Sequence, residues 1–171
     1  MENEVMVEQV VKIEDYVDEL SELLIQVVGD GASIGFLPPL KMEEAKCYWE
    51  GVLQSDCILF ITKVNQEIAG TVQLHLCMKE NGRHRAEVAK LMTHPGFRRM
   101  GLGRQLMEVL EDKAKRDGRT LLVLDTREGD PSNRLYQAMD YVEAGKIPNY
   151  AKSANGDYHS TIYYYKELKV T

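Results

Sequence analysis

Three glycines and three arginines gather in the nine residues from Gly96 to Arg104. Arg98 and Arg99 precede Gly101 and Gly103, and an amphipathic run begins at once. Glycine lets main-chain N–H groups turn toward a ligand without a Cβ in the way. The start of a helix adds its positive dipole end to the same place. The segment therefore predicts an anion-binding loop at a helix N-terminus.

Two common phosphate-binding motifs fit this loop poorly. A P-loop needs lysine and then serine or threonine after its second glycine, but Leu102 and Gly103 follow Gly101. The dinucleotide motif G-x-G-x-x-G/A would have Leu106 as its third small residue, where a close helix–strand contact is needed. The interpretation that remains is R-x-x-G-x-G, with a pyrophosphate bound by Arg98, Arg99, Met100, Gly101, Leu102, Gly103 and Arg104.

The strand expected just before the loop, "AEVAKLMT", suggests the rest of the ligand. An unpaired part of that strand could hydrogen-bond an extended chain that contains amides, as in β-augmentation. A pyrophosphate joined to such a chain describes coenzyme A, and we expect Leu91, Met92 and Thr93 to contact it. The alternative is a glycine-rich surface loop whose arginines are simply solvated.

Two segments, "LMTHPGFRRMGLGRQLM" and "NRLYQAMDYVEAG", resemble the GNAT superfamily of acetyl-CoA-dependent N-acetyltransferases. A closer resemblance is to the bacterial tabtoxin-resistance acetyltransferases, through "HRAEVAKLM", "LDT" and "IPNY…GDYHSTIYYYK". The resemblance implies the acyl-CoA N-acyltransferase fold and acetyl-CoA (coenzyme A) as the cofactor. It also implies transfer of the acetyl group to the primary amine of a small amino-acid-like or toxin-like or antibiotic-like molecule.

The reaction implied by this resemblance is direct attack of a neutral amine on the acetyl thioester. It needs removal of a proton from the amine, a donor to the oxyanion and a proton for the departing thiolate. The resemblance places a main-chain N–H near Met92 at the thioester oxygen and Tyr136 near the sulfur, as general acid. Glu87 and Asp125 occupy matching strand positions for the general base, and the choice between them stays open.

Each of these side chains also has a purely structural interpretation. Tyr136 could be a packed aromatic, Asp125 a cap on the turn after its strand, and Glu87 an exposed strand residue. His159 is either an edge-strand histidine or a neighbour of the acceptor. The loop "SIGFLPPL" covers either the acceptor site or the core.

The sequence departs from the superfamily pattern at one position. Many members carry an asparagine seven residues before the tyrosine, where it contacts the cofactor, and that position is Gly129 here. Asn133 lies only three residues before Tyr136, so the cofactor contact is not assigned to it.

Hydrophobic periodicity predicts the elements that must position these residues. The order βααβββαβαββ predicts an α/β fold in a single domain, residues 1–171, with a mixed, mostly antiparallel sheet flanked by helices. The run "TLLVLDT" is typical of a strand buried on both faces. We expect strands over 5–12, 57–64, 68–78, 86–93, 120–126, 141–147 and 158–168, helices over 13–29, 41–54, 103–117 and 131–139, and a polar loop over 148–157.

The net charge of -6 argues against a nucleic-acid binder, which needs a surplus of lysine and arginine. No apolar run approaches the roughly 20 residues of a membrane-spanning helix. We therefore expect a cytoplasmic protein with no nucleic-acid or membrane partner. The four scattered histidines predict no metal site. The resemblance implies an enzyme with a small-molecule amine acceptor and a possible homodimer. Two alternatives remain: a non-catalytic acyl-CoA sensor module, and an acetyltransferase that acts on peptide or protein amines.

Overall fold

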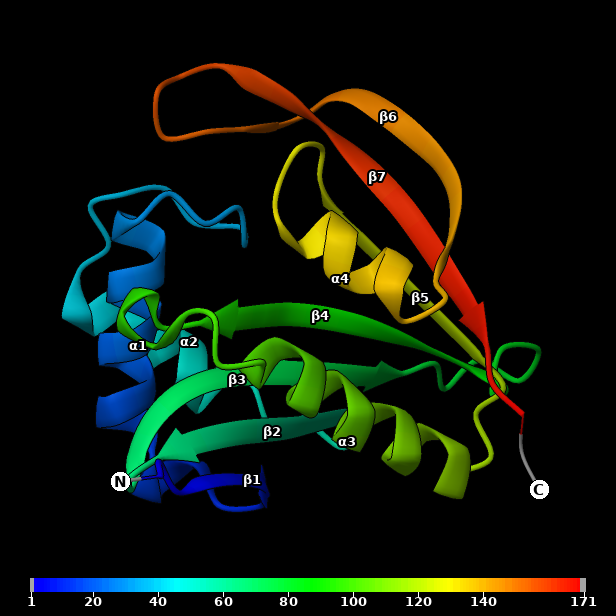
Figure 1. Cartoon of the computed structure of the whole chain (residues 1–171), viewed down its shortest axis with the longest axis horizontal. Coiled ribbons are helices and arrows are strands. Elements are labelled where there is room, and N and C mark those ends of the chain that lie inside the picture. The colour runs from blue at the N-terminus through cyan, green and yellow to red at the C-terminus, as the bar shows by residue number, and fades with distance from the viewer. Residues whose placement is uncertain (1, 170–171) are drawn as a thin grey trace.

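The computed structural model describes residues 2–169, and within them one seven-stranded sheet has helices on both faces (Figure 1). The strand order is β1-β2-β3-β4-β5-β7-β6, and every pair is antiparallel except β4 with β5. The predicted α/β class with a mostly antiparallel sheet is confirmed. The elements are β1 (Val5–Val10), η1 (Ile13–Asp15), α1 (Val17–Gly29), α2 (Met42–Glu50), β2 (Cys57–Val64), β3 (Glu67–Leu76), β4 (Arg85–Thr93), η2 (Pro95–Phe97), α3 (Leu102–Arg116), β5 (Leu121–Arg127), α4 (Ser132–Ala138), β6 (Val142–Lys152) and β7 (Tyr158–Glu167).

Helices α3 and α4 cover one face of the sheet and helices α1 and α2 cover the other. Leu106 and Leu110 of α3 pack with Tyr136 of α4 against alternate residues of the strands. On the opposite face, Leu24 of α1 and Trp49 of α2 pack against the strand residues that point the other way. The alternation of buried side chains along the strands therefore supplies the two large hydrophobic clusters, one on each face of the sheet. No helix within residues 2–169 has the length and apolar character needed to span a membrane.

The two parallel strands stay together for only a short distance. Their pairing consists of Arg85 with Leu121, Ala86 with Leu122 and Glu87 with Val123. Beyond these pairs β4 continues to Thr93 and β5 to Arg127, and the two strands diverge (Figure 1). The edge of β4 that faces β5 therefore has no strand partner beyond Glu87 among residues 2–169.

Two predictions about the strands were wrong in detail. Residues 148–152 belong to β6 rather than to a loop. Pro148 is tolerated because β6 is an edge strand that pairs only with β7, so the missing N–H breaks no second ladder. Strand β5 is buried on one face only, through Leu122 and Leu124, because its other face lies beyond the cover of α1 and α2.

Candidate active site

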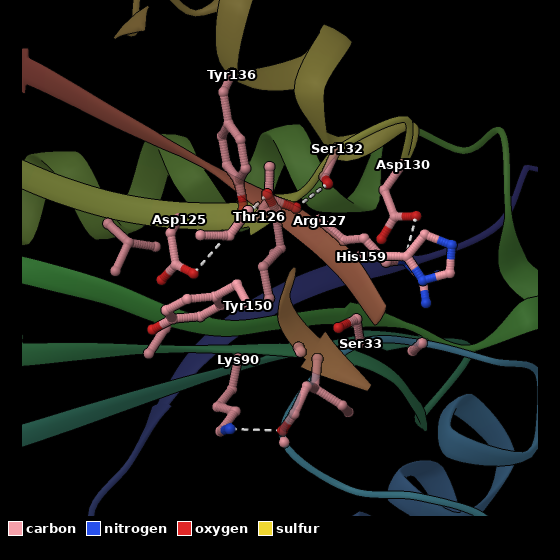
Figure 2. A pocket seen from close by; sticks show the side chains of 18 of the residues that line it. Ser33, Lys90, Asp125, Thr126, Arg127, Asp130, Ser132, Tyr136, Tyr150 and His159 are labelled. Atoms are coloured by element: carbon pink, nitrogen blue, oxygen red, sulfur yellow. Dashed lines mark hydrogen bonds and ion pairs between the residues drawn. The ribbon is translucent and has the colours of Figure 1, made fainter. Parts of the chain in front are cut away.

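A cavity of about 390 Å³ opens where β4 and β5 separate. Four residues predicted for the site line it, namely Glu87 and Leu91 on β4, Asp125 on β5 and Tyr136 on α4. Figure 2 shows Tyr136 extending from α4 toward Asp125, with Lys90 reaching toward the segment after α1. Residues far apart in sequence are thus brought to one place by the divergence of the two strands.

The two predicted carboxylates differ in their surroundings. Asp125 Oδ2 accepts a hydrogen bond of 2.7 Å from the hydroxyl of Thr161, which is buried on β7. Glu87 is exposed, and no hydrogen bond to its carboxylate is found among residues 2–169. The fixed Asp125 is therefore oriented toward the cavity by its neighbour, whereas Glu87 remains open to water.

Tyr136 is 5% exposed, and its hydroxyl makes no hydrogen bond within the described chain. Burial first, and then the charge of Asp125, raises the pKa of Tyr136. A buried phenol normally finds a polar partner. Here the group faces a cavity, keeps its proton at neutral pH and can donate it to a molecule bound there.

The N-terminus of α3 is the second part of the site. Gly101 precedes the helix with φ +73, and Arg99 also has a positive φ of 64. No side chain among residues 2–169 caps α3, and the first helical bond is from the Gln105 N–H to Gly101 O. The main-chain N–H groups of 98–104 make no hydrogen bond to the described chain. Such open N–H groups at a positive dipole end form an anion site.

The predicted loop residues have different environments. Arg98 forms an ion pair with Asp30, just after α1, and Arg104 pairs with Glu108 at 3.1 Å. Met100 packs against a small cluster that contains the buried Leu102. The loop thus combines open main-chain donors with side chains that fasten it to neighbouring elements, and Gly103 lies in the first turn of α3.

The sequence predicts a main-chain N–H near Met92 at the thioester oxygen, and the structure describes the surroundings of this residue. The Met92 side chain is 4% exposed and packs in the cluster under α1. Met92 pairs with Thr71 of β3, and the N–H of His94, two residues further along, donates to Ala69 O. Main-chain bonds to one neighbouring strand recur at every second residue, so the main-chain groups of Met92 also point toward β3. Thr93, which alternates with it, directs its main-chain groups toward the open edge of β4. The sequence could place a donor in this segment, but only the register identifies which residues face β5.

The wall opposite β4 depends on Arg127, which the sequence analysis missed. Its guanidinium donates to Asp130 Oδ1 at 2.9 Å, to Gly31 O at 3.0 Å and to Ser153 Oγ at 3.2 Å. These contacts join β5 to the segment after α1 and to the β6–β7 hairpin. The cavity is therefore bridged on this side rather than open as a long groove.

Two other residues and one loop considered from the sequence also have defined places. His159 lines the cavity and its Nδ1 lies 2.5 Å from Ser153 Oγ. From the 33–40 loop, Ser33, Ile34 and Gly35 line the cavity. Asn133 binds the Arg127 carbonyl through Nδ2 at 2.9 Å and does not line the cavity, so its contacts fasten α4 to β5.

Comparisons with known proteins agree with this architecture. Residues 25–141 match the model of the "Acetyltransferase (GNAT) family". An uncharacterized N-acetyltransferase from the hisH-hisA intergenic region of Azospirillum brasilense is 32% identical over 113 residues, which are 64% of this chain and 67% of that protein.

Two solved structures have the same fold. An N-acetyltransferase from Staphylococcus aureus Mu50 superimposes with a TM-score of 0.83 at 18% identity, over 97% of this chain and 99% of that one. The putative acetyltransferase yncA from Salmonella typhimurium, solved with its cofactor acetyl-CoA, gives 0.79 at 18% identity, over 98% and 95% of the two chains. Since the family model covers more than half of the sequence, the chain belongs to the GNAT family of acetyltransferases, which are acyltransferases that use acetyl-CoA.

Proposed function

We propose that this protein transfers the acetyl group of acetyl-CoA to the primary amine of a small amino-acid-like or toxin-like molecule. The observation that carries the proposal is the continuity of the site. Strand β4 leads from Glu87, past its open edge, to the uncapped N-terminus of α3. A cavity with a second carboxylate, Asp125, and the phenol of Tyr136 lies beside the same edge.

The residues present fit acetyl-CoA. The N–H groups of 98–104 have no partner in the described chain and suit the pyrophosphate. The open edge of β4 suits the amide-containing arm, and we assign Leu91 and Thr93 to it, with Met92 as the core residue between them. When bound, acetyl-CoA supplies the acetyl group as an activated thioester.

We assign the proton transfers to three side chains. Asp125, oriented by Thr161, takes the proton from the amine, and exposed Glu87 attracts the cationic amine and exchanges protons with water. Burial and the charge of Asp125 raise the pKa of Tyr136 and so keep its hydroxyl protonated, and we assign to this hydroxyl the proton that the departing sulfur receives. A main-chain N–H of the β4 edge stabilises the developing negative charge on the acetyl oxygen.

The shape of the cavity favours a small acceptor over a peptide. A peptide requires an extended groove, but Arg127 connects the segment after α1 with the β6–β7 hairpin across one side. The resemblance to the tabtoxin-resistance enzymes supports an acceptor of the amino-acid or toxin type.

The proposal is tested in two steps. Isothermal titration with acetyl-CoA should give saturable binding, and no binding at high micromolar concentration would refute it. Free-thiol release from acetyl-CoA, measured with a library of small amines and of peptides, should then give turnover with small amines. Turnover with peptides alone would contradict the proposed acceptor class while keeping the cofactor.

A further inference from the structure

Lys90 is turned into the acceptor cavity by a bulge in β4. Gln73 pairs with Ala89 and Thr71 with Met92, so two residues of β4, Lys90 and Leu91, oppose a single residue of β3. Regular alternation from Val88 would point Lys90 toward α3. Instead Lys90 has a φ of +56 and lines the cavity. A positive φ is uncommon for lysine and stores strain, and bulges of this kind redirect side chains at functional sites.

A glycine in the facing segment lets the chain approach the Lys90 ammonium closely. The Nζ atom donates to Ile34 O at 2.5 Å and lies 5.8 Å from the centre of the Phe36 ring. A Cβ on Gly35 would lie 2.9 Å from Nζ, so a larger residue there would displace the ammonium. Gly35 also has a φ of +91, which favours glycine. The bulge at Lys90 and the glycine at position 35 thus hold the Lys90 ammonium at one place on the cavity wall.

The charge of Lys90 is not neutralised within the described chain. An ammonium has three N–H donors, and the one hydrogen bond found within residues 2–169 goes to Ile34 O. Burial lowers the pKa of Lys90, and the charges of Asp125 and Glu87 oppose this effect, but neither carboxylate forms an ion pair with it. Arg127 differs, because its donors are occupied by Asp130, Gly31 and Ser153. A partly buried cation with donors to spare suits an anion that arrives with a ligand.

We propose that Lys90 binds a carboxylate of the acceptor, while Asp125 and Glu87 bind its amine. The acceptor class is then a zwitterionic amino acid rather than a simple amine. A phosphate is disfavoured, because its two negative charges would lie beside two carboxylates. The proposal rests on the proposed acetyl transfer and adds the residue that selects the acceptor.

The test compares acceptors that differ only in the carboxylate. Free-thiol release from acetyl-CoA is measured with the standard L-amino acids, their carboxamides and the matching decarboxylated amines. The wild type should prefer the amino acid in each pair that it turns over. Lys90→Met should lower kcat/KM for the amino acid about 10- to 100-fold, the value of a charge-assisted hydrogen bond, mainly through KM. The carboxamide should change less than about threefold, because the lost interaction involves only the carboxylate.

The control variant is Lys46→Met, which removes the same charge from α2 outside the cavity, where Lys46 pairs with Asp18 at 3.2 Å. It should keep the preference for the amino acid. Acetyl-CoA affinity and the melting temperature of Lys90→Met, measured in parallel, should stay close to those of the wild type.

Each outcome decides between the proposals. An equal loss with acid and carboxamide would make Lys90 a structural residue and overturn this inference. Turnover of amines without carboxylates, with no amino acid accepted, would also overturn it and leave the N-acetyltransferase activity in place. Absence of turnover with any amine would contradict both proposals.

Discussion

Thr161 on β7 donates its hydroxyl to Asp125 Oδ2 on β5 at 2.7 Å, from a position that is 3% exposed. This contact crosses between neighbouring strands and holds the carboxylate at the cavity wall. It is the clearest difference between Asp125 and Glu87, whose carboxylate accepts no hydrogen bond within the described residues. The proposed proton acceptor is therefore the carboxylate with a fixed orientation.

Asp125→Asn should lower kcat/KM by about 10²- to 10⁴-fold, the usual value of a general base. Thr161→Val should lower it by about 10-fold, because it removes one charge-assisted hydrogen bond but keeps the carboxylate. Thr161→Ser is the matched control, since it restores the hydroxyl and should act like the wild type. A larger loss in Glu87→Gln than in Asp125→Asn, measured by free-thiol release, would assign the base to Glu87 instead.

Tyr136→Phe should lower kcat by about 10²- to 10⁴-fold while leaving acetyl-CoA affinity within about threefold, because the hydroxyl serves proton transfer and the ring serves packing. The raised pKa means that this phenol loses its proton only above its ordinary value of about 10, so any activity decline from Tyr136 belongs above that pH. Steady-state kinetics from pH 7 to 10.5 measure kcat and its pH dependence, and titration calorimetry in parallel measures the affinity for acetyl-CoA. An unchanged kcat would remove Tyr136 as the general acid, whereas acetyl-CoA binding without turnover in the wild type would favour the non-catalytic sensor.

Gly101→Glu should abolish measurable acetyl-CoA binding. A Cβ at Gly101 meets no atom within 4 Å, so the added carboxylate would enter the space in front of the α3 N-terminus and repel the pyrophosphate. Gly118→Glu is a matched control, because Gly118 has a φ of +75, similar open space and a position just after the other end of α3. Calorimetry should find nearly normal binding in Gly118→Glu; nearly normal binding in Gly101→Glu would remove the loop from the cofactor site.

Lys166→Met should destabilise the fold by about 3 kcal/mol, because it leaves a buried carboxylate without its cation. Glu111 is 5% exposed on α3 and accepts from Lys166 Nζ at 2.6 Å and from the Tyr141 hydroxyl at 3.1 Å. The double variant Glu111→Gln with Lys166→Met removes both charges and keeps an acceptor for Tyr141. It should recover about 1 kcal/mol or more in urea unfolding, and a double variant less stable than Lys166→Met would contradict this account.

Much of the fold could be read from local patterns. The strand expected over 57–64 matches Cys57–Val64, because its apolar run ends at a turn signal on each side. The start of α3 also lies within one residue of its prediction, since Gly101, with its positive φ, ends the loop that precedes the helix. β6 extends through Pro148 because only its position at the sheet edge makes proline acceptable there.

The candidate site could be predicted only where residue type and motif were enough. Residue type and position in the matching motifs identified three side chains that line one cavity, namely those of Glu87, Asp125 and Tyr136. Lys90 could not be found, because a bulge with a left-handed lysine has no pattern and reverses the face that alternation predicts. The roles of Arg127 and Thr161 depend on contacts between segments at least 26 residues apart.

Because β4 diverges from β5, an internal strand of the sheet has unpaired main-chain groups along one border. Unpaired groups of this kind can pair with a strand of another chain and so promote aggregation. Here the border is recessed beside α4 and the segment after α1, where a broad neighbouring sheet cannot reach it but a slender flexible molecule can. Its amide protons should exchange quickly with heavy water in the free protein and slowly once such a molecule lies along it. The unpaired groups are therefore accessible to the ligand but not to a strand of another protein.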